Sequence, residues 1–249
     1  MFGCVPAPER LILFDIDGTL LSAGAAPRRA FRRALVEYFG TEGAAASDDF
    51  SGKTDPQIVY ELMTAAGFED DHISERIAAV FERYLEGLAA ELQRETRHRL
   101  FPGVGTLLPR LADDPRVVLG LVTGNVREGA RLKLDHFGLW ELFQVGAFGS
   151  DDRVRDRLPP IAVERAQGLT GRVFEGEEVV IVGDTPADIR CARATGALAV
   201  AVATGLPTRE SLAAAEPDIL LDSLAAWPDL LAELDLVDRS TETSEARRI

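Results

Sequence analysis

Two aspartates, separated by a single residue, directly follow the first strongly apolar segment of the chain. Residues 11–14 are all apolar, and Asp15 and Asp17 come next, before Gly18. Glycine permits a tight backbone turn, so both carboxylates can face one point. Two carboxylates this close repel each other unless a cation lies between them or one holds a proton. The pair therefore predicts either a site for a hard metal ion or a nucleophile beside an acid–base group.

A second pair of carboxylates follows another apolar segment, residues 179–182. Asp184 and Asp188 are four residues apart, and Pro186 lies between them. Proline is common in the first turn of a helix. We therefore expect a helix to begin near Pro186 and to turn both carboxylates toward one cleft. The additional carboxylates favour a Mg²⁺ site made of oxygen ligands.

A hydroxyl group and two small or polar residues follow a third apolar segment, residues 117–122. They are Thr123, Gly124 and Asn125. A hydroxyl group together with free backbone N–H groups at a strand end forms a cradle for an anion. We expect this segment to bind an oxyanion.

Three arginines precede a helical pattern at residues 161–167. They are Arg153, Arg155 and Arg157. A positive charge in the cleft would neutralise a phosphoryl group during its transfer. The spacing alone leaves open which of the three arginines supplies that charge.

The apolar segments that precede these residues predict the elements that position them. Runs of four to six apolar, often β-branched residues indicate strands buried on both faces. A further run of this kind lies at residues 198–202 and a shorter one at 219–221, and helical patterns separate most of the runs. This alternation predicts an α/β fold with a Rossmann-like parallel sheet. Ligands bind beyond the carboxyl ends of the strands in such sheets, so the polar residues above are expected to converge there.

The segment after the first aspartate pair has a different pattern. Amphipathic helical patterns cover residues 28–38, 56–66 and 73–94, and no buried strand is apparent between them. A Phe-Pro-Gly-Val segment at residues 101–104 indicates the return to the core. We therefore expect three parts, listed here by residue number: an α/β core at 1–22 and 101–237, a helical cap at 23–100 and a flexible tail at 238–249.

Composition limits the partners. The chain has 249 residues and a net charge of −14, which speaks against nucleic acid as a partner because phosphates would be repelled. The chain contains neither an apolar run of about 18 residues nor an apolar leader, and its two cysteines form no disulfide framework. We expect a cytoplasmic protein, monomeric or homodimeric, that acts on a small soluble ligand and not at a membrane.

Together these motifs, each at a predicted strand end, resemble the haloacid dehalogenase superfamily of aspartate-nucleophile phosphohydrolases. In layout the chain is similar to phosphoglycolate phosphatase-like members that carry a helical cap after the first motif. The resemblance covers residues 10–225. The matching motifs are D-x-D-G-T at residues 15–19, a strand-end threonine at Thr123, and G-D-x-x-x-D at Gly183, Asp184 and Asp188.

The resemblance implies a role for each matching aspartate. Asp15 would attack phosphorus and form an aspartyl-phosphate, and Asp17 would protonate the leaving oxygen and then activate water. Mg²⁺ would be held by the Asp15 carboxylate, the Asp17 backbone carbonyl and the Asp184 carboxylate. Asp188 would support the site from close by, and Gly18 would permit the turn of the first motif.

The resemblance also implies which residues contact the phosphoryl group. Thr123, the N–H groups of Gly124 and Asn125, and a cation would stabilise its charge. The family's third motif usually supplies a lysine, and Arg157 matches that position here, with Arg153 and Arg155 as alternatives.

Relatives often place a glycine-containing substrate loop in this part of the cap. The corresponding residues here are Gly52, Lys53 and Thr54, and we expect Lys53 and Thr54 to face the cleft when the cap closes. Such a cap would enclose a small phosphorylated metabolite and exclude larger phosphates.

The resemblance therefore implies a Mg²⁺-dependent phosphatase of small phosphate monoesters, similar to phosphoglycolate phosphatase. A sugar-phosphate mutase similar to β-phosphoglucomutase is the alternative. A dehalogenase is disfavoured because its chemistry needs no acid at position 17. A non-catalytic phosphate-binding module is disfavoured because Asp15, Asp17, Thr123 and Asp184 are all present.

Overall fold

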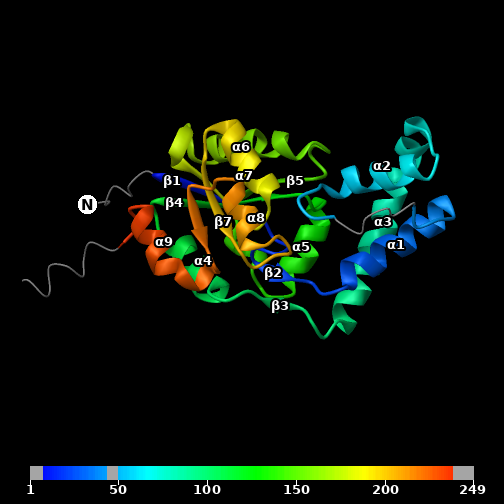
Figure 1. Ribbon diagram of the computed structural model, residues 1–249, viewed down its shortest axis with the longest axis horizontal. Coiled ribbons are helices and arrows are strands. Elements are labelled where there is room, and N and C mark those ends of the chain that lie inside the picture. The colour runs from blue at the N-terminus through cyan, green and yellow to red at the C-terminus, as the bar shows by residue number, and fades with distance from the viewer. Residues whose placement is uncertain (1–7, 44–49, 238–249) are drawn as a thin grey trace, which may run out of the picture.

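The computed structural model describes residues 8–43 and 50–237, which form a sheet-based core and a helical cap (Figure 1). The six core strands are β1 Arg10–Phe14, β4 Val117–Thr123, β5 Val145–Phe148, β6 Val179–Gly183, β7 Leu198–Val202 and β8 Ile219–Leu221. They form one parallel sheet in the order β5-β4-β1-β6-β7-β8. The expected α/β fold with a parallel sheet is confirmed.

Helices cover both faces of this sheet. They are α4 Val104–Asp113, α5 Arg127–Asp135, α6 Leu158–Thr170, α7 Pro186–Thr195, α8 Arg209–Ala214 and α9 Trp227–Glu233, with the short 3-10 helices η1 Trp140–Leu142, η2 Arg155–Arg157, η3 Gly176–Glu178 and η4 Leu224–Ala226. Successive side chains of a strand point to opposite faces. Ile12 and Phe14 accordingly pack with residues of α4, α5 and α9, whereas Leu11 and Leu13 pack with residues of α6, α7 and α8. This burial on both faces explains why the strands read as continuous apolar runs.

The cap consists of α1 Ala26–Phe39, α2 Asp55–Ala65 and α3 Asp70–Arg94, at the right of Figure 1. These helices lie where the three amphipathic patterns predicted them. Phe31 of α1 packs edge-on against Tyr84 of α3, with 5.3 Å between the ring centroids. Arg29 adds ion pairs to Glu91 (2.6 Å) and Glu95 (3.0 Å), so apolar and charged contacts both join the two long helices.

A short antiparallel ribbon connects the cap to the core. Its strands are β2 Leu21–Ser22 and β3 Arg99–Leu100, and Leu21 pairs with Leu100. The chain therefore leaves the core and returns to it at neighbouring positions, close to the first aspartate pair.

Strand β5 was not predicted, because it has four residues, includes Gly146 and lies at the sheet edge. The expected tail at residues 238–249 lies outside the described residues. Within residues 8–43 and 50–237, every helix is too short or too polar to cross a membrane.

Candidate active site between core and cap

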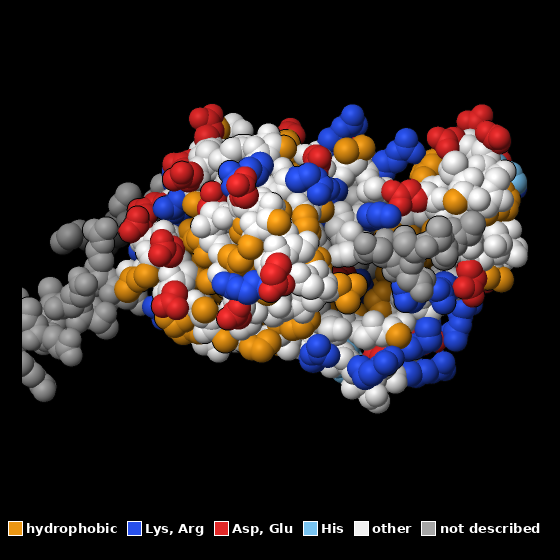
Figure 2. Space-filling view, viewed as in Figure 1, with side chains coloured by type: hydrophobic (Ala, Val, Ile, Leu, Met, Phe, Trp, Pro, Cys, Tyr) orange, Lys and Arg blue, Asp and Glu red, His pale blue; other side chains and the backbone are white. Residues whose placement is uncertain are grey.

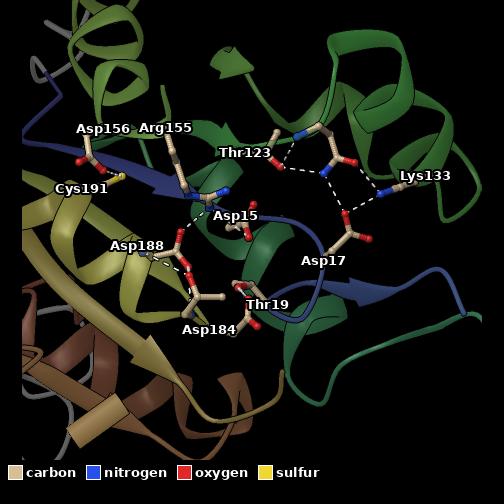
Figure 3. A network of polar contacts seen from close by, with 12 residues as sticks. Asp15, Asp17, Thr19, Thr123, Lys133, Arg155, Asp156, Asp184, Asp188 and Cys191 are labelled. Atoms are coloured by element: carbon tan, nitrogen blue, oxygen red, sulfur yellow. Dashed lines mark hydrogen bonds and ion pairs between the residues drawn. The ribbon is translucent and has the colours of Figure 1, made fainter. Parts of the chain in front are cut away.

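The register of the three central strands brings the sequence motifs together. Phe14, the last residue of β1, pairs with Leu121 of β4 on one side and with Val182 of β6 on the other. Because the three strands are parallel, the residues that follow these paired positions all lie toward the same edge of the sheet. Asp15, Thr123 and Asp184 therefore emerge at one edge of the sheet, although they are up to 169 residues apart in sequence (Figure 3).

Three carboxylates form a compact buried cluster at this edge. Oxygens of Asp15, Asp184 and Asp188 all lie within 4.8 Å of one another, and none of these residues is more than 6% exposed. Burial raises the pKa of Asp15 to about 6, although the charge of Arg155 opposes that shift. Burial, reinforced by the charges of Asp15 and Asp188, raises the pKa of Asp184 well above its usual value. Burial and mutual repulsion therefore favour the protonated form of these carboxyl groups unless a further cation lies among them.

The start of α7 positions two members of this cluster. Thr185 and Asp188 form a reciprocal cap, in which the Asp188 N–H donates to Thr185 Oγ1 (3.3 Å) and the Thr185 N–H donates to Asp188 Oδ2 (3.0 Å). The helix begins at Pro186, as the sequence predicted. Thr19 Oγ1 donates to Asp184 Oδ1 (2.9 Å), which orients the other carboxylate.

Gly18 is required for the close approach of these two segments. Its backbone φ is +90°, a conformation that residues with a Cβ rarely adopt. A Cβ at this position would also lie 2.2 Å from Asp184 Oδ2. Any other residue would therefore displace the Asp184 carboxylate.

Arg155 supplies the cation beside the carboxylate cluster. Its guanidinium donates to Asp188 Oδ1 and lies 3.3 Å from Asp15 Oδ2, and the residue is 6% exposed. Burial alone would lower the pKa of Arg155, but the charges of Asp188 and Asp15 raise it above its usual value. The arginine is therefore held as a cation beside Asp15.

The structure does not bring Arg157 to the site, and this corrects the expectation for that residue. The Arg157 side chain is 69% exposed and pairs with Asp152 (3.3 Å) on the surface. Arg153 lies over the Tyr60 ring, 4.6 Å from its centroid. Residues two apart in a 3-10 helix point in different directions, so η2 turns Arg155 inward and Arg157 outward.

Asp17 lies apart from the carboxylate cluster, on the side of the cleft formed by α5 (Figure 3). Asn125 Nδ2 donates to Asp17 Oδ2 (2.8 Å) and to Thr123 Oγ1 (2.8 Å). Lys133 Nζ donates to Asp17 Oδ2 (2.5 Å) and to Asn125 Oδ1 (2.5 Å). Sequence reasoning missed Lys133, because 116 residues separate it from Asp17; its rarity, as one of two lysines, was the available signal.

The loop before α2 docks directly on the phosphate-binding segment predicted from the sequence. The Asp55 N–H donates to the Gly124 carbonyl (2.7 Å), and the Val126 N–H donates to Asp55 Oδ2 (2.9 Å). Thr54 Oγ1 donates to the Arg153 carbonyl (2.7 Å). Burial raises the pKa of Asp55 to about 6, against the attraction of Lys133. Asp55 was not singled out in the sequence, where it resembles an ordinary helix-capping acid.

The predicted cap-loop residues are therefore divided in their contacts. Thr54 is fully buried and caps α2, accepting the Gln57 N–H (3.1 Å), and its contacts are with protein. Lys53 lines the cleft, and its ammonium pairs with Glu61 (2.6 Å). Gly52 approaches α7, where an added Cβ would lie 2.7 Å from the Ala187 Cβ.

A cavity of about 490 Å³ lies between the cap and these strand ends. Its lining includes Asp15, Asp17, Thr123, Lys133, Arg155 and Asp184 from the core, and Arg28, Phe31, Phe50 and Tyr84 from the cap. The surface is visibly hollowed between core and cap, and basic side chains gather along the lower edge of the cap (Figure 2). A larger hollow of about 1420 Å³ beside it contains neither Asp15 nor Asp184, so the inner cavity is the candidate active site.

The carboxylate cluster fits a small divalent cation. Its three acids face a single guanidinium, and all of their ligand atoms are oxygens, which Mg²⁺ prefers. Both oxygens of Asp188 already accept hydrogen bonds, from Arg155 and from Thr185. Asp15 and Asp184 are therefore the better placed ligands, and the contribution of the Asp17 backbone carbonyl stays a prediction.

Comparisons with known proteins also relate this chain to hydrolases. A family model described as "Haloacid dehalogenase-like hydrolase" matches residues 12–202. A phosphoglycolate phosphatase of Synechococcus elongatus is 35% identical over 219 residues, which cover 85% of this chain and 92% of that protein.

Two solved structures share the fold. A predicted phosphatase from Clostridium acetobutylicum has a TM-score of 0.67 at 18% identity, over 91% of this chain and 100% of its own. A structure described as "putative beta-phosphoglucomutase from Thermotoga maritima" has a TM-score of 0.59 at 20% identity, over 90% of this chain and 99% of its own. Because the sequence identities are this low, the two structures support the similarity of fold alone.

Proposed function

This chain belongs to the haloacid dehalogenase-like hydrolases and is a phosphatase of that family, and we propose that it hydrolyses small phosphate monoesters in the cleft between core and cap. One observation carries the proposal. Asp15, beside the Arg155 guanidinium, and Asp17, held by Asn125 and Lys133, line the same cavity. A nucleophile and a separate acid–base group are what hydrolysis through a covalent intermediate requires.

The proposed reaction has two steps. A carboxylate oxygen of Asp15 attacks phosphorus, the bond from phosphorus to the ester oxygen breaks, and Asp17, which enters this step protonated on Oδ1, gives that oxygen its proton. An aspartyl-phosphate and an alcohol result. Asp17, now a carboxylate, then takes a proton from the water that attacks phosphorus, which releases phosphate and restores Asp15.

The phosphoryl group remains charged throughout, and the site offers positive groups to it. Arg155 lies beside Asp15, and Thr123 with the Gly124 and Asn125 N–H groups lies at the neighbouring strand end. Asp15 and Asp184 would hold Mg²⁺, and the bound ion would neutralise charge shared by the phosphoryl group and the attacking carboxylate.

The cap side of the cavity supports an anionic substrate of the phosphoglycolate type. Arg28 and Arg99 both line the cavity. Arg28 lies over Phe50 (5.5 Å) and Arg99 over Phe101 (5.4 Å). A guanidinium is a planar cation whose paired N–H donors match the geometry of a carboxylate. The curated relative from Synechococcus elongatus, a phosphoglycolate phosphatase, supports the same substrate class.

Phosphate release tests this function. Wild type and Asp15→Asn would be assayed with an aryl phosphate and with phosphoglycolate, in Mg²⁺ or in chelator. Activity that requires both Mg²⁺ and Asp15 is the expected result. Isomerisation of a sugar phosphate with little phosphate release would instead favour the mutase, and metal-dependent binding without turnover would favour a binding module.

A further inference from the structure

Lys133 is a buried lysine with an unusual set of partners. The residue is 3% exposed, and its ammonium contacts Asp17 Oδ2 and Asn125 Oδ1, each at 2.5 Å. Asn125 Nδ2 reaches the same Asp17 oxygen (2.8 Å). The three side chains therefore form a closed triangle of hydrogen bonds (Figure 3).

Burial of Lys133 on α5 would cost free energy if its ammonium group did not contact Asp17 and Asn125. The buried face of this helix consists of Gly129, Ala130, Lys133 and Leu134. Lysine is almost never buried unless it is paired, because a charge away from water loses its hydration. Here Oδ2 of the Asp17 carboxyl group and the Asn125 amide oxygen replace that hydration. The contacts are thus specific to Asp17 and Asn125.

The triangle leaves Asp17 with its two oxygens in different situations. Both hydrogen bonds to this carboxylate fall on Oδ2. Within residues 8–43 and 50–237, no hydrogen bond reaches Oδ1, and the side chain remains 41% exposed. One oxygen is therefore anchored, and the other is available to a substrate or a water molecule.

We infer that Lys133 is a positioning residue for proton transfer by Asp17. It anchors Oδ2, so that Oδ1 faces the leaving oxygen in the first step and the attacking water in the second. The inference rests on the proposed function, in which Asp17 is the acid–base group. Alignment of such a group matters because proton transfer needs hydrogen-bond geometry.

A different role for Lys133 makes a different prediction. Lys133 also lines the cavity, so a rival role is direct binding of the phosphoryl group. Every substrate contains the same phosphoryl group. Weaker binding of that group would therefore lower kcat/KM for all esters by a similar factor. Misalignment of Asp17, in contrast, slows formation of the aspartyl-phosphate only where the leaving oxygen needs a proton, and kcat/KM reports that first step.

Two aryl esters whose leaving groups differ in basicity separate these roles. Dinitrophenolate departs without a proton, whereas phenolate is a poor leaving group. For Lys133→Met we expect kcat/KM to fall by at least about tenfold with phenyl phosphate and by less than about threefold with 2,4-dinitrophenyl phosphate. Both esters are measured on one enzyme preparation, so their ratio does not depend on how much of the variant is folded.

Three further variants serve as controls. Asp17→Asn should give the same pattern, and Lys133→Met added to it should change the ratio no further. Arg155→Met, which removes a cation beside Asp15, should lower kcat/KM by a similar factor for both esters.

The outcomes are distinguishable. An equal loss with both esters in Lys133→Met, while wild type is active, would overturn this inference and leave the proposed function intact. A wild type that releases phosphate from no ester in Mg²⁺ would overturn the proposed function and this inference with it.

Discussion

Arg155 is the residue on which charge balance at the carboxylate cluster depends. Its guanidinium contacts both Asp15 and Asp188. We expect Arg155→Met to lower kcat/KM by about 100-fold or more, because it removes a buried charge from the reacting phosphoryl group. The measurement is phosphate release in saturating Mg²⁺.

Arg157 provides a matched control two residues away. Its side chain is 69% exposed and lies 3.3 Å from the Asp152 carboxylate, away from the carboxylate cluster, so Arg157→Met should change kcat/KM by less than about twofold. If Arg157→Met were the more damaging variant, the assignment of the third motif to Arg155 would be wrong.

The raised pKa of Asp15 predicts how Mg²⁺ affinity depends on pH. This pKa is about 6 in the metal-free protein, so Asp15 gains a proton between pH 7.5 and pH 5.5. Mg²⁺ must displace that proton. The apparent Kd should therefore be at least about fourfold weaker at pH 5.5, and proton uptake by Asp184 adds to the effect.

Isothermal titration calorimetry with Mg²⁺ at the two pH values checks this prediction. Proton release on binding should be seen near pH 6, and Asp15→Asn should lose it. A Kd that is the same at both pH values would contradict the assignment of Asp15 as a ligand.

At the scale of elements, the cap closes through a close backbone contact. An added Cβ on Gly124 would lie 2.0 Å from the Lys53 carbonyl oxygen. Gly124→Ala keeps the N–H group but separates the cap loop from the core. We expect kcat/KM for phosphoglycolate to fall by about tenfold or more, because an open cap admits water and leaves its substrate contacts unmade.

Gly168→Ala is the control for this variant. Gly168 lies in α6 with open space around its Cα, so alanine there should leave activity unchanged and raise Tm slightly. Full activity of Gly124→Ala would show that docking of the cap loop is not needed for turnover.

A cluster of paired acidic and basic side chains joins the two long cap helices. Its contribution to folding stability depends on pH. Hydrogen bonds from the Arg97 side chain and backbone, with others from Arg29 and Ala25, lower the pKa of Glu95 to about 2. A lowered folded-state pKa stabilises the protein above the unfolded value near 4.5, and this stabilisation is lost as pH falls toward about 2. Glu95→Gln should therefore lower Tm at pH 7.

Thermal unfolding at pH 7 and pH 3 tests the sign. The Tm difference between wild type and Glu95→Gln should shrink at pH 3. Glu86→Gln, whose side chain is 73% exposed, should change Tm little at either pH. A difference that grows at pH 3 would contradict the ion-pair explanation.

At the scale of the whole molecule, the cap limits which phosphates reach Asp15. The proposed nucleophile, Asp15, is 6% exposed, and the cavity that it lines holds about 490 Å³. We expect kcat/KM for phosphoglycolate to exceed that for a phosphoserine peptide by about 100-fold or more, because the peptide would keep the cap open. Comparable rates for the two substrates would contradict an enclosed site.

The sequence by itself determined the class of fold and where its chemistry lies. Continuous apolar runs specify strands buried on both faces, and their polar ends put Asp15, Thr123 and Asp184 at one edge of the sheet. Helical periodicity located the three cap helices, and Pro186 marked the start of α7. These features follow from local spacing, which a single sequence records directly.

Only the tertiary structure decided which distant residues complete the site. Three arginines share one short segment, and the turn of η2 selected Arg155. Lys133 and Asp55 reach the cleft from separate helices, 116 and 38 residues away from Asp17. The short edge strand β5 depends on pairing with β4. Such contacts depend on how whole elements pack, and neither composition nor spacing along the chain encodes them locally.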